Sequence, residues 1–263
     1  MKNSYEIYAV IRLLKRYDYD GAIEVLELLS LQNHPLYYLV ASCHRSLNFN
    51  FYGAQELLKE IKTPFPHQYS GIRRYIQEIP PLIKGNPGYI FNELFDNIVI
   101  QLEREEYTEF LGRIFQLREL LLKYAVIQFK ERKDYSLRDR IYQKHVFVTH
   151  FKIRHGLMNG MKEILRTGGG RWQKILNILT GKPMSELMDL RHQTIVAHGI
   201  ETATLRDISR IYQSPEHVLN DLRQVFQYLN IFIRPHKYTD VNQNIFDILN
   251  LCLNTTSDIT DNL

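Results

Sequence analysis

Apolar residues recur along most of the chain at the spacing of an amphipathic α-helix. In residues 5–16 the apolar positions follow the i, i+3, i+4, i+7 pattern and comprise Ile7, Val10, Ile11 and Leu14. The same spacing predicts helices at 21–31, 36–47, 53–61, 91–104, 108–129, 137–165, 171–179, 185–198 and 217–233. No run of four to eight residues alternates apolar and polar positions between turn signals, so no strand is expected. The pattern predicts an all-α protein.

Two eight-residue segments, 19–26 and 51–58, resemble each other at an offset of 32 positions. In each, an aromatic residue precedes a Gly-Ala pair, and a glutamate follows two positions after the alanine. The period is close to the ~34 residues of tetratricopeptide repeats. We therefore predict a repeat-like block of helical hairpins, in which the Gly-Ala pair lets a neighbouring helix approach. The alternative is two helix pairs that merely resemble each other.

Prolines divide the chain. Five of its nine prolines fall in residues 63–88, which predicts a domain boundary there. We expect a tetratricopeptide-like helical domain over 1–85, a second helical domain over 86–254 and a flexible tail over 255–263.

Composition narrows the class of protein. Apolar residues make up 44% of the 263, which excludes an intrinsically disordered chain. The 33 basic and 29 acidic residues give a net charge of +4, which permits a polyanionic partner without requiring one. Cys43 and Cys252 are too few for a disulfide framework or a cysteine-based zinc site. With no secretory signal pattern and no apolar run of about 18 residues, we expect a cytoplasmic protein without a membrane partner.

One segment carries candidate chemistry. Residues 184–199 contain Arg191, His192 and His198, and Gly199 is a plausible helix stop. On a helix over 185–198, the rotation about the helix axis from Arg191 to His198 would be about 20° less than two full turns. Both would then project from one face, about 10 Å apart along the axis.

An arginine and a histidine suit the cleavage of RNA without a metal. A guanidinium holds a phosphate and offsets the charge that develops on it, while an imidazole exchanges a proton near neutral pH. The 2′-hydroxyl of RNA is then the nucleophile. A complete acid–base cycle needs two such pairs, which predicts a homodimer with two copies facing each other across a two-fold axis.

The motif Arg191-His192, five residues, His198-Gly199 resembles the Arg-x(4–6)-His signature of HEPN domains. The segment 110–120, with Arg113 and Glu119, is similar to the first helix of HEPN domains in type III CRISPR accessory ribonucleases. The resemblance implies a homodimeric, metal-independent endoribonuclease of antiviral defence that cleaves single-stranded RNA. It makes Arg191 and His198 the catalytic pair and His192 their variable polar neighbour, with no cofactor.

The resemblance leaves the activator open. Such ribonucleases normally begin with a CARF domain that senses cyclic oligoadenylate, whereas residues 1–85 show no β–α alternation. The missing sensor argues against activation by a cyclic oligonucleotide, and it leaves open a stand-alone effector and an effector that takes its signal from a protein partner. Two alternatives remain: a HEPN toxin of a toxin–antitoxin pair, and a helical interaction module without catalysis.

Two further features bear on the ribonuclease hypothesis. Glu119 is a candidate to orient Arg191 across a helix pair. Basic and aromatic residues interleave between 138 and 154, where they would line an RNA groove.

Overall fold

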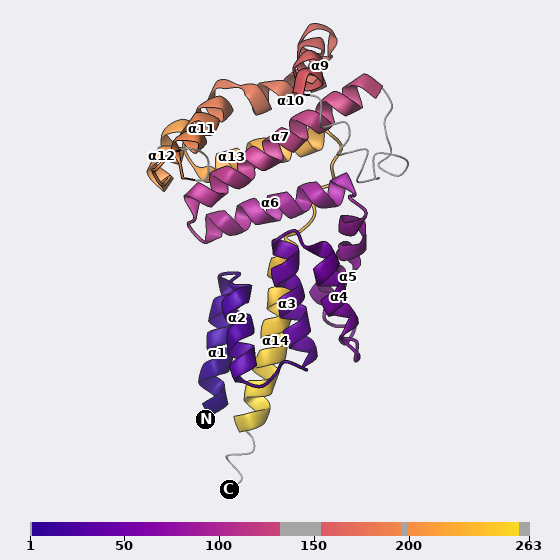
Figure 1. Cartoon of the computed structure of the whole chain (residues 1–263), viewed down its shortest axis with the longest axis vertical. Helices are drawn as coiled ribbons and strands as arrows, with labels where there is room; N and C mark the ends of the chain where they lie inside the picture. Colours follow the sequence, from indigo (N-terminus) through magenta and orange to yellow (C-terminus); the bar gives the residue numbers. More distant parts are fainter. Residues whose placement is uncertain (1, 132–153, 196–198, 258–263) are drawn as a thin grey trace. The chain divides into compact units, whose positions relative to one another are not determined.

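The computed structural model describes residues 2–131, 154–195 and 199–257, and the chain divides into two compact units. Unit 1 combines residues 1–84 with 235–263, and unit 2 is the continuous segment 85–234. Within the described ranges every regular element is a helix, which confirms the all-α prediction (Figure 1). None of the described helices has the length and apolarity that a membrane crossing requires.

Unit 1 begins with two helical hairpins and is completed by two further helices. Its elements are α1 (Lys2–Lys15), α2 (Tyr19–Leu28), α3 (Pro35–Leu47), α4 (Phe51–Lys59), α5 (Ser70–Ile83) and α14 (Lys237–Ser257). Within the hairpins α1 packs against α2 and α3 against α4. Ala22 and Ala54, which the sequence comparison aligns, are both fully buried.

The turn inside each hairpin repeats as well. Tyr17 and Phe49, 32 residues apart, both adopt a positive φ, of 55° and 59°. In each turn the next residue donates its backbone N–H to the carbonyl five positions earlier, which closes the preceding helix. The internal repeat is therefore a repeated helix–corner–helix unit, and its relation to tetratricopeptide proteins stays a prediction.

The glycine of each repeat serves its own helix. The side chains of Asp18 and Asn50 accept hydrogen bonds from the backbone N–H of Gly21 and Gly53, at 3.0 and 2.9 Å. A Cβ on Gly53 would lie 2.7–2.9 Å from the Asn50 side chain. The glycine leaves room for the capping side chain, and the alanine that follows packs in the core.

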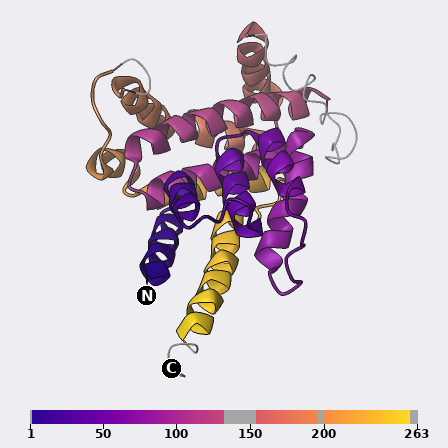
Figure 2. The same cartoon turned by 60° about the horizontal axis from the view of Figure 1, so that its bottom comes forward.

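Helix α14, far along the chain, lies against α1 and α5 (Figures 1 and 2). Buried polar groups fix its register: Asn242 accepts from the Tyr19 hydroxyl and donates to the Leu14 carbonyl, both at 2.9 Å. The Tyr238 hydroxyl donates to Ser46 on α3 at 3.1 Å. One face of the repeat block is thus covered by the chain's own helix.

The start of α5 is capped by a residue of α14. The side-chain oxygen of Asn244 accepts from the backbone N–H groups of Gly71 and Ile72, at 2.8 and 3.2 Å. A Cβ on Gly71 would overlap the carbonyl of Asp240, so glycine is required for this close approach.

Unit 2 is built around the long helix α7. Its described elements are α6 (Pro87–Glu103), α7 (Tyr107–Glu131), α9 (Arg154–Thr167), α10 (Gly170–Thr180), α11 (Lys182–Gln193), α12 (Leu205–Tyr212) and α13 (Pro215–Tyr228). Helix α7 contacts α6, α9, α10 and α11. In the core, the Phe91 ring contacts the rings of Tyr124 and Phe226, with centroids 5.2 and 6.2 Å apart.

Several elements differ from the sequence predictions. Helices α5, α12 and α14 were not predicted, and α11 ends five residues before the predicted limit of 198. Residues 235–254, assigned to the second domain, belong to unit 1, because α14 packs on α1 and α5. Helix α14 also runs to Ser257, into the predicted tail, and residues 258–263 lie outside the described ranges.

Candidate functional site

Helix α11 carries the candidate motif and is held by contacts with α7, α10 and α12. Pro183 stands in its first turn, where a missing N–H costs nothing. Met184, Leu187 and Met188 are buried and form the apolar stripe that faces these helices. The packing of this stripe fixes the rotation of α11, and with it the direction of the residues in its last turn.

The helix ends at Gln193, so the prediction of a continuous helix over 185–198 is wrong. Thr194 has an extended backbone, with φ −90° and ψ 161°, and is almost fully buried. Its backbone N–H and hydroxyl both donate to the carbonyl of Arg191, at 3.1 and 2.7 Å. A β-branched residue that caps the last turn in this way stops the helix, and the two-turn spacing of Arg191 and His198 on one helix face does not apply.

Backbone hydrogen bonds join the two short backbone segments that flank residues 196–198 in the sequence. Ile195 donates to the Glu201 carbonyl at 3.1 Å, and Gly199 donates to the Thr194 carbonyl at 3.0 Å. An isolated parallel bridge pairs Thr194 with Glu201. The chain therefore returns to the end of α11 at Gly199, the residue that follows His198 in the sequence.

Position 199 requires glycine, because the backbone lies against the end of α11 there. A Cβ there would overlap the carbonyl group of Gln193. The His-Gly dipeptide of the motif thus has a steric reason for its second member. In the sequence, Gly199 was interpreted as a helix stop, whereas in the structure it allows one backbone segment to lie against another.

Arg191 packs against α7. Its guanidinium lies over the Phe115 ring, 4.3 Å from the centroid. The side chain is half-buried, and its Nε has no hydrogen-bond partner among the described residues. No carboxylate pairs with it within the described ranges. Arg191 is thus a cation held by an aromatic face, with no acidic partner in the part of the chain that the structure describes.

His192 also touches Phe115, with ring centroids 6.2 Å apart in an edge-on arrangement. Its side chain is exposed. The structure therefore brings two of the three predicted site residues, Arg191 and His192, to one aromatic ring. The third, His198, lies outside the described residues.

The predicted orienting role of Glu119 is not what the structure shows. Glu119 forms an ion pair with Lys123 on its own helix. Phe115, one turn earlier on α7, takes the place beside Arg191. The basic and aromatic stretch proposed as an RNA groove lies in residues 138–154, of which 138–153 are outside the described ranges.

Arg118 ties α7 to the end of α10, just before α11 begins. Its Nε donates to the Leu179 carbonyl at 2.6 Å, in the last turn of α10, where a cation is favourable. Burial lowers the pKa of Arg118, and burial also raises the pKa of Tyr212, which donates to Asp221 at 3.1 Å. These contacts join α7 to α10 and α12 to α13, and α7, α10 and α12 are the helices that contact α11.

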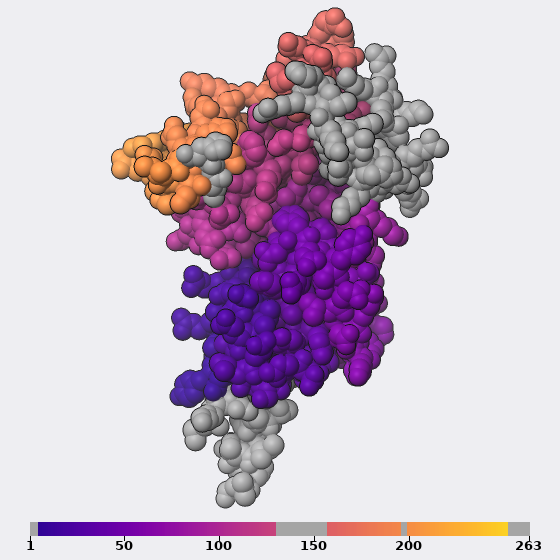
Figure 3. Space-filling model, in the orientation of Figure 1, coloured from indigo at the N-terminus to yellow at the C-terminus, as the bar shows by residue number. Residues whose placement is uncertain are grey.

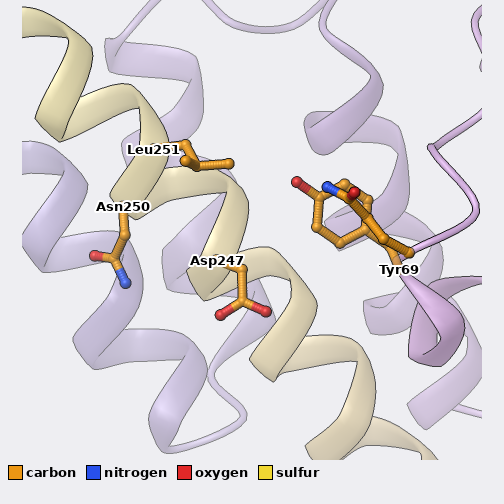
Figure 4. Close-up of a pocket in the computed structure, with 5 residues that line it drawn as sticks. Tyr69, Asp247, Asn250 and Leu251 are labelled. Carbon is orange, nitrogen blue, oxygen red and sulfur yellow. The ribbon is translucent and has the colours of Figure 1, made fainter.

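A shallow hollow of about 400 Å³ lies in unit 1, away from the motif in sequence (Figure 4). It is lined by Gln68, Tyr69, Asp247, Asn250 and Leu251. Its carboxylate already accepts a hydrogen bond from Gln243 at 3.0 Å. The described residues contain no group of three or more potential metal ligands.

Comparisons with protein-family models, with curated proteins and with solved structures gave no match. The HEPN resemblance therefore remains a hypothesis drawn from residues of the chain itself.

Sequence reasoning missed two residues that shape the site. Phe115 lies four positions before Glu119 in the predicted α7 helix, so an aromatic on the same face was a visible alternative partner for Arg191. Thr194 lies inside the helix predicted over 185–198, although threonine near a helix end is a common capping residue. Neither the helical position of Phe115 nor the capping tendency of threonine indicates which helix packs against α11.

Proposed function

We propose that this protein is a metal-independent endoribonuclease that cleaves single-stranded RNA, with its site at the C-terminal end of α11. The observation that carries the proposal is Arg191, held over Phe115 at 4.3 Å without a carboxylate partner among the described residues. A guanidinium in this state has its charge available for a phosphodiester.

The proposed reaction is an internal transesterification. His198 removes the proton of a 2′-hydroxyl, the 2′-oxygen forms a bond to the adjacent phosphorus, and the bond from phosphorus to the 5′-oxygen breaks. A protonated histidine of a second copy gives its proton to the leaving 5′-oxygen. Arg191 offsets the additional negative charge on the phosphorane. The products are a 2′,3′-cyclic phosphate and a 5′-hydroxyl.

The loop between Thr194 and Glu201 supports this assignment of roles. Its closure by backbone hydrogen bonds returns Gly199 to the end of α11, where Arg191 stands. Gly199 directly follows His198 in the sequence, and His198 itself lies outside the described residues. The same arrangement fits an effector of CRISPR-linked defence and a toxin restrained by an antitoxin, since both use one reaction.

The alternative of a helical interaction module is weaker. That hypothesis needs an open face on the repeat block for a partner helix. In unit 1, α14 already packs against α1 and α5 and is bonded to α3 through Tyr238 and Ser46. The chain itself occupies a face that such a partner would use.

The test is cleavage of end-labelled single-stranded RNA in the presence of a chelator. We expect 2′,3′-cyclic phosphate ends from the wild type and none from Arg191→Ala or His198→Ala. Arg223→Ala is the matched control, because Arg223 also lies over a phenylalanine ring, that of Phe95 at 5.1 Å. Full activity of Arg191→Ala, or a requirement for magnesium, would refute the proposal.

A further inference from the structure

Helix α1 presents an exposed stripe of aromatic and basic side chains. We define the α1 stripe as Tyr5, Tyr8, Arg12 and Lys15, all of which are exposed. At 100° per residue these four positions fall within an arc of about 80°, and they extend over about 15 Å of helix. Arg16, also exposed, directly follows the helix.

The two tyrosines are unusually open for large apolar rings. Tyr5 is 79% and Tyr8 57% exposed, although α1 buries Val10 and Leu14 completely on its other face. Side chains project from the indigo N-terminal helix in the space-filling view (Figure 3). A ring with a free face is a platform on which a nucleobase can stack.

The charge of the stripe is of one sign. Glu6 is the only acidic residue of α1 and lies about 100° from Tyr5, the nearest edge of the stripe. Among the described residues, no ion pair links Arg12, Lys15 or Arg16 to a carboxylate, including the acidic side chains of the neighbouring α2. The cations are therefore available to phosphates, and they follow the two rings along the helix.

We propose that the α1 stripe is a binding site for single-stranded nucleic acid, with bases stacked on Tyr5 and Tyr8 and phosphates on Arg12 and Lys15. Exposed rings on which bases stack, next to cations that contact phosphates, are the combination that binds single strands without reading their sequence. The site binds RNA and DNA alike, because neither stacking nor phosphate contact uses the 2′-hydroxyl.

Binding to this site is separable from the proposed cleavage. DNA has no 2′-hydroxyl, so it is not a substrate for the proposed ribonuclease but is a ligand for the stripe. The experiment therefore measures fluorescence anisotropy of the full chain with a labelled single-stranded DNA of mixed sequence at several salt concentrations. Failure of cleavage leaves this measurement unaffected.

The two kinds of contact predict different signatures. Tyr8→Ala lowers affinity about tenfold, because base stacking on an aromatic ring is worth on the order of tenfold or more per base. It leaves the salt dependence unchanged. Arg12→Gln lowers the slope of log affinity against log salt by about 0.7, the value expected for one lost phosphate contact on a single strand.

Matched controls come from α4. Tyr52, 60% exposed, is replaced by alanine, and Lys59, whose amine pairs with Glu56 at 2.7 Å, is replaced by glutamine. Neither control changes affinity or slope if the α1 stripe is the site. Circular dichroism checks that each variant keeps its helix content.

Three results overturn the proposal. One is undiminished DNA binding by the Tyr8→Ala, Arg12→Gln double variant. Another is a loss of DNA affinity in the Tyr52 and Lys59 variants that equals the loss in the Tyr8 and Arg12 variants. The third is no binding of single strands together with binding to vesicles containing an anionic lipid, which would assign the stripe to a membrane surface.

Discussion

Gly199 lies so close to Gln193 that any side chain at position 199 would overlap the Gln193 carbonyl group. This contact closes the loop that begins at Thr194 and joins the chain after His198 to the end of α11. The geometry of the candidate site thus depends on a residue that carries no chemistry of its own.

Replacement of this glycine tests the loop. We expect Gly199→Ala to open the contact with Gln193 and to abolish RNA cleavage, while helix content stays unchanged. Gly170→Ala is the control, because a Cβ at Gly170 meets no atom within 4 Å. Helix propensity makes that variant neutral or slightly stabilising. Wild-type cleavage by Gly199→Ala would mean that the loop is not part of the site.

Phe115 is expected to act as a positioning residue for Arg191. Phe115→Leu keeps an apolar side chain but removes the ring under the guanidinium, whose contact is worth roughly 1–2 kcal/mol in a partly buried place. We expect kcat for RNA cleavage to fall about tenfold with KM nearly unchanged. Phe115→Tyr restores the ring and should restore kcat. Equal rates for the leucine and wild-type proteins would contradict the role.

Asn244 is expected to stabilise unit 1 by capping α5. Asn244→Ala leaves the N–H groups of Gly71 and Ile72 without their acceptor and should lower the free energy of unfolding by about 1 kcal/mol. Urea unfolding measures the change. Asn250→Ala, on the exposed side of the same helix, should change it by less than about 0.5 kcal/mol. A smaller effect of Asn244→Ala than of the control would refute the capping role.

The capping box of α12 makes one part of stability depend on pH. The Thr204 hydroxyl donates to Asp207 at 2.6 Å, and this hydrogen bond holds the pKa of Asp207 below its usual value. Because the folded pKa is the lower one, Asp207 stabilises the fold above about pH 4 and loses this effect as the pH falls further.

The measurement is the melting temperature of wild type and Asp207→Asn from pH 6 to pH 3. We expect the wild type to melt higher at pH 6 and the difference to shrink towards pH 3. Asp189→Asn is the control, since exposed Asp189 makes no hydrogen bond among the described residues. A difference that grows on acidification would have the wrong sign for a lowered pKa.

The helical class followed from periodicity, but α5 was hidden by a local signal. The apolar spacing of Ile72, Tyr75, Ile79 and Leu82 is helical, yet Pro80 and Pro81 lie in the proline-rich segment 63–88 that was interpreted as a domain boundary. In α5 the carbonyls that lose a backbone donor to these prolines belong to Ile76 and Gln77. Both residues are exposed, so water can replace the missing donors.

The candidate site was predictable in composition but not in geometry. The sequence singled out Arg191 and His192, and the structure places both beside Phe115. Where α11 ends depends on hydrogen bonds from Thr194 and on the close approach of Gly199, which involve residues brought together only by the fold. Spacing along a helix cannot anticipate a backbone that leaves the helix.

The split of unit 1 between both halves of the chain sets an order of events during translation. The first five helices emerge from the ribosome long before α14, which covers α1 and α5 and is separated from them by the 150 residues of unit 2. At about 5–20 residues per second, synthesis of unit 2 takes roughly 8–30 s, and during this time α14 does not yet cover the hairpins. The inserted unit, being continuous, can mature first, and an uncovered apolar face during this interval is a natural place for a chaperone to hold the chain.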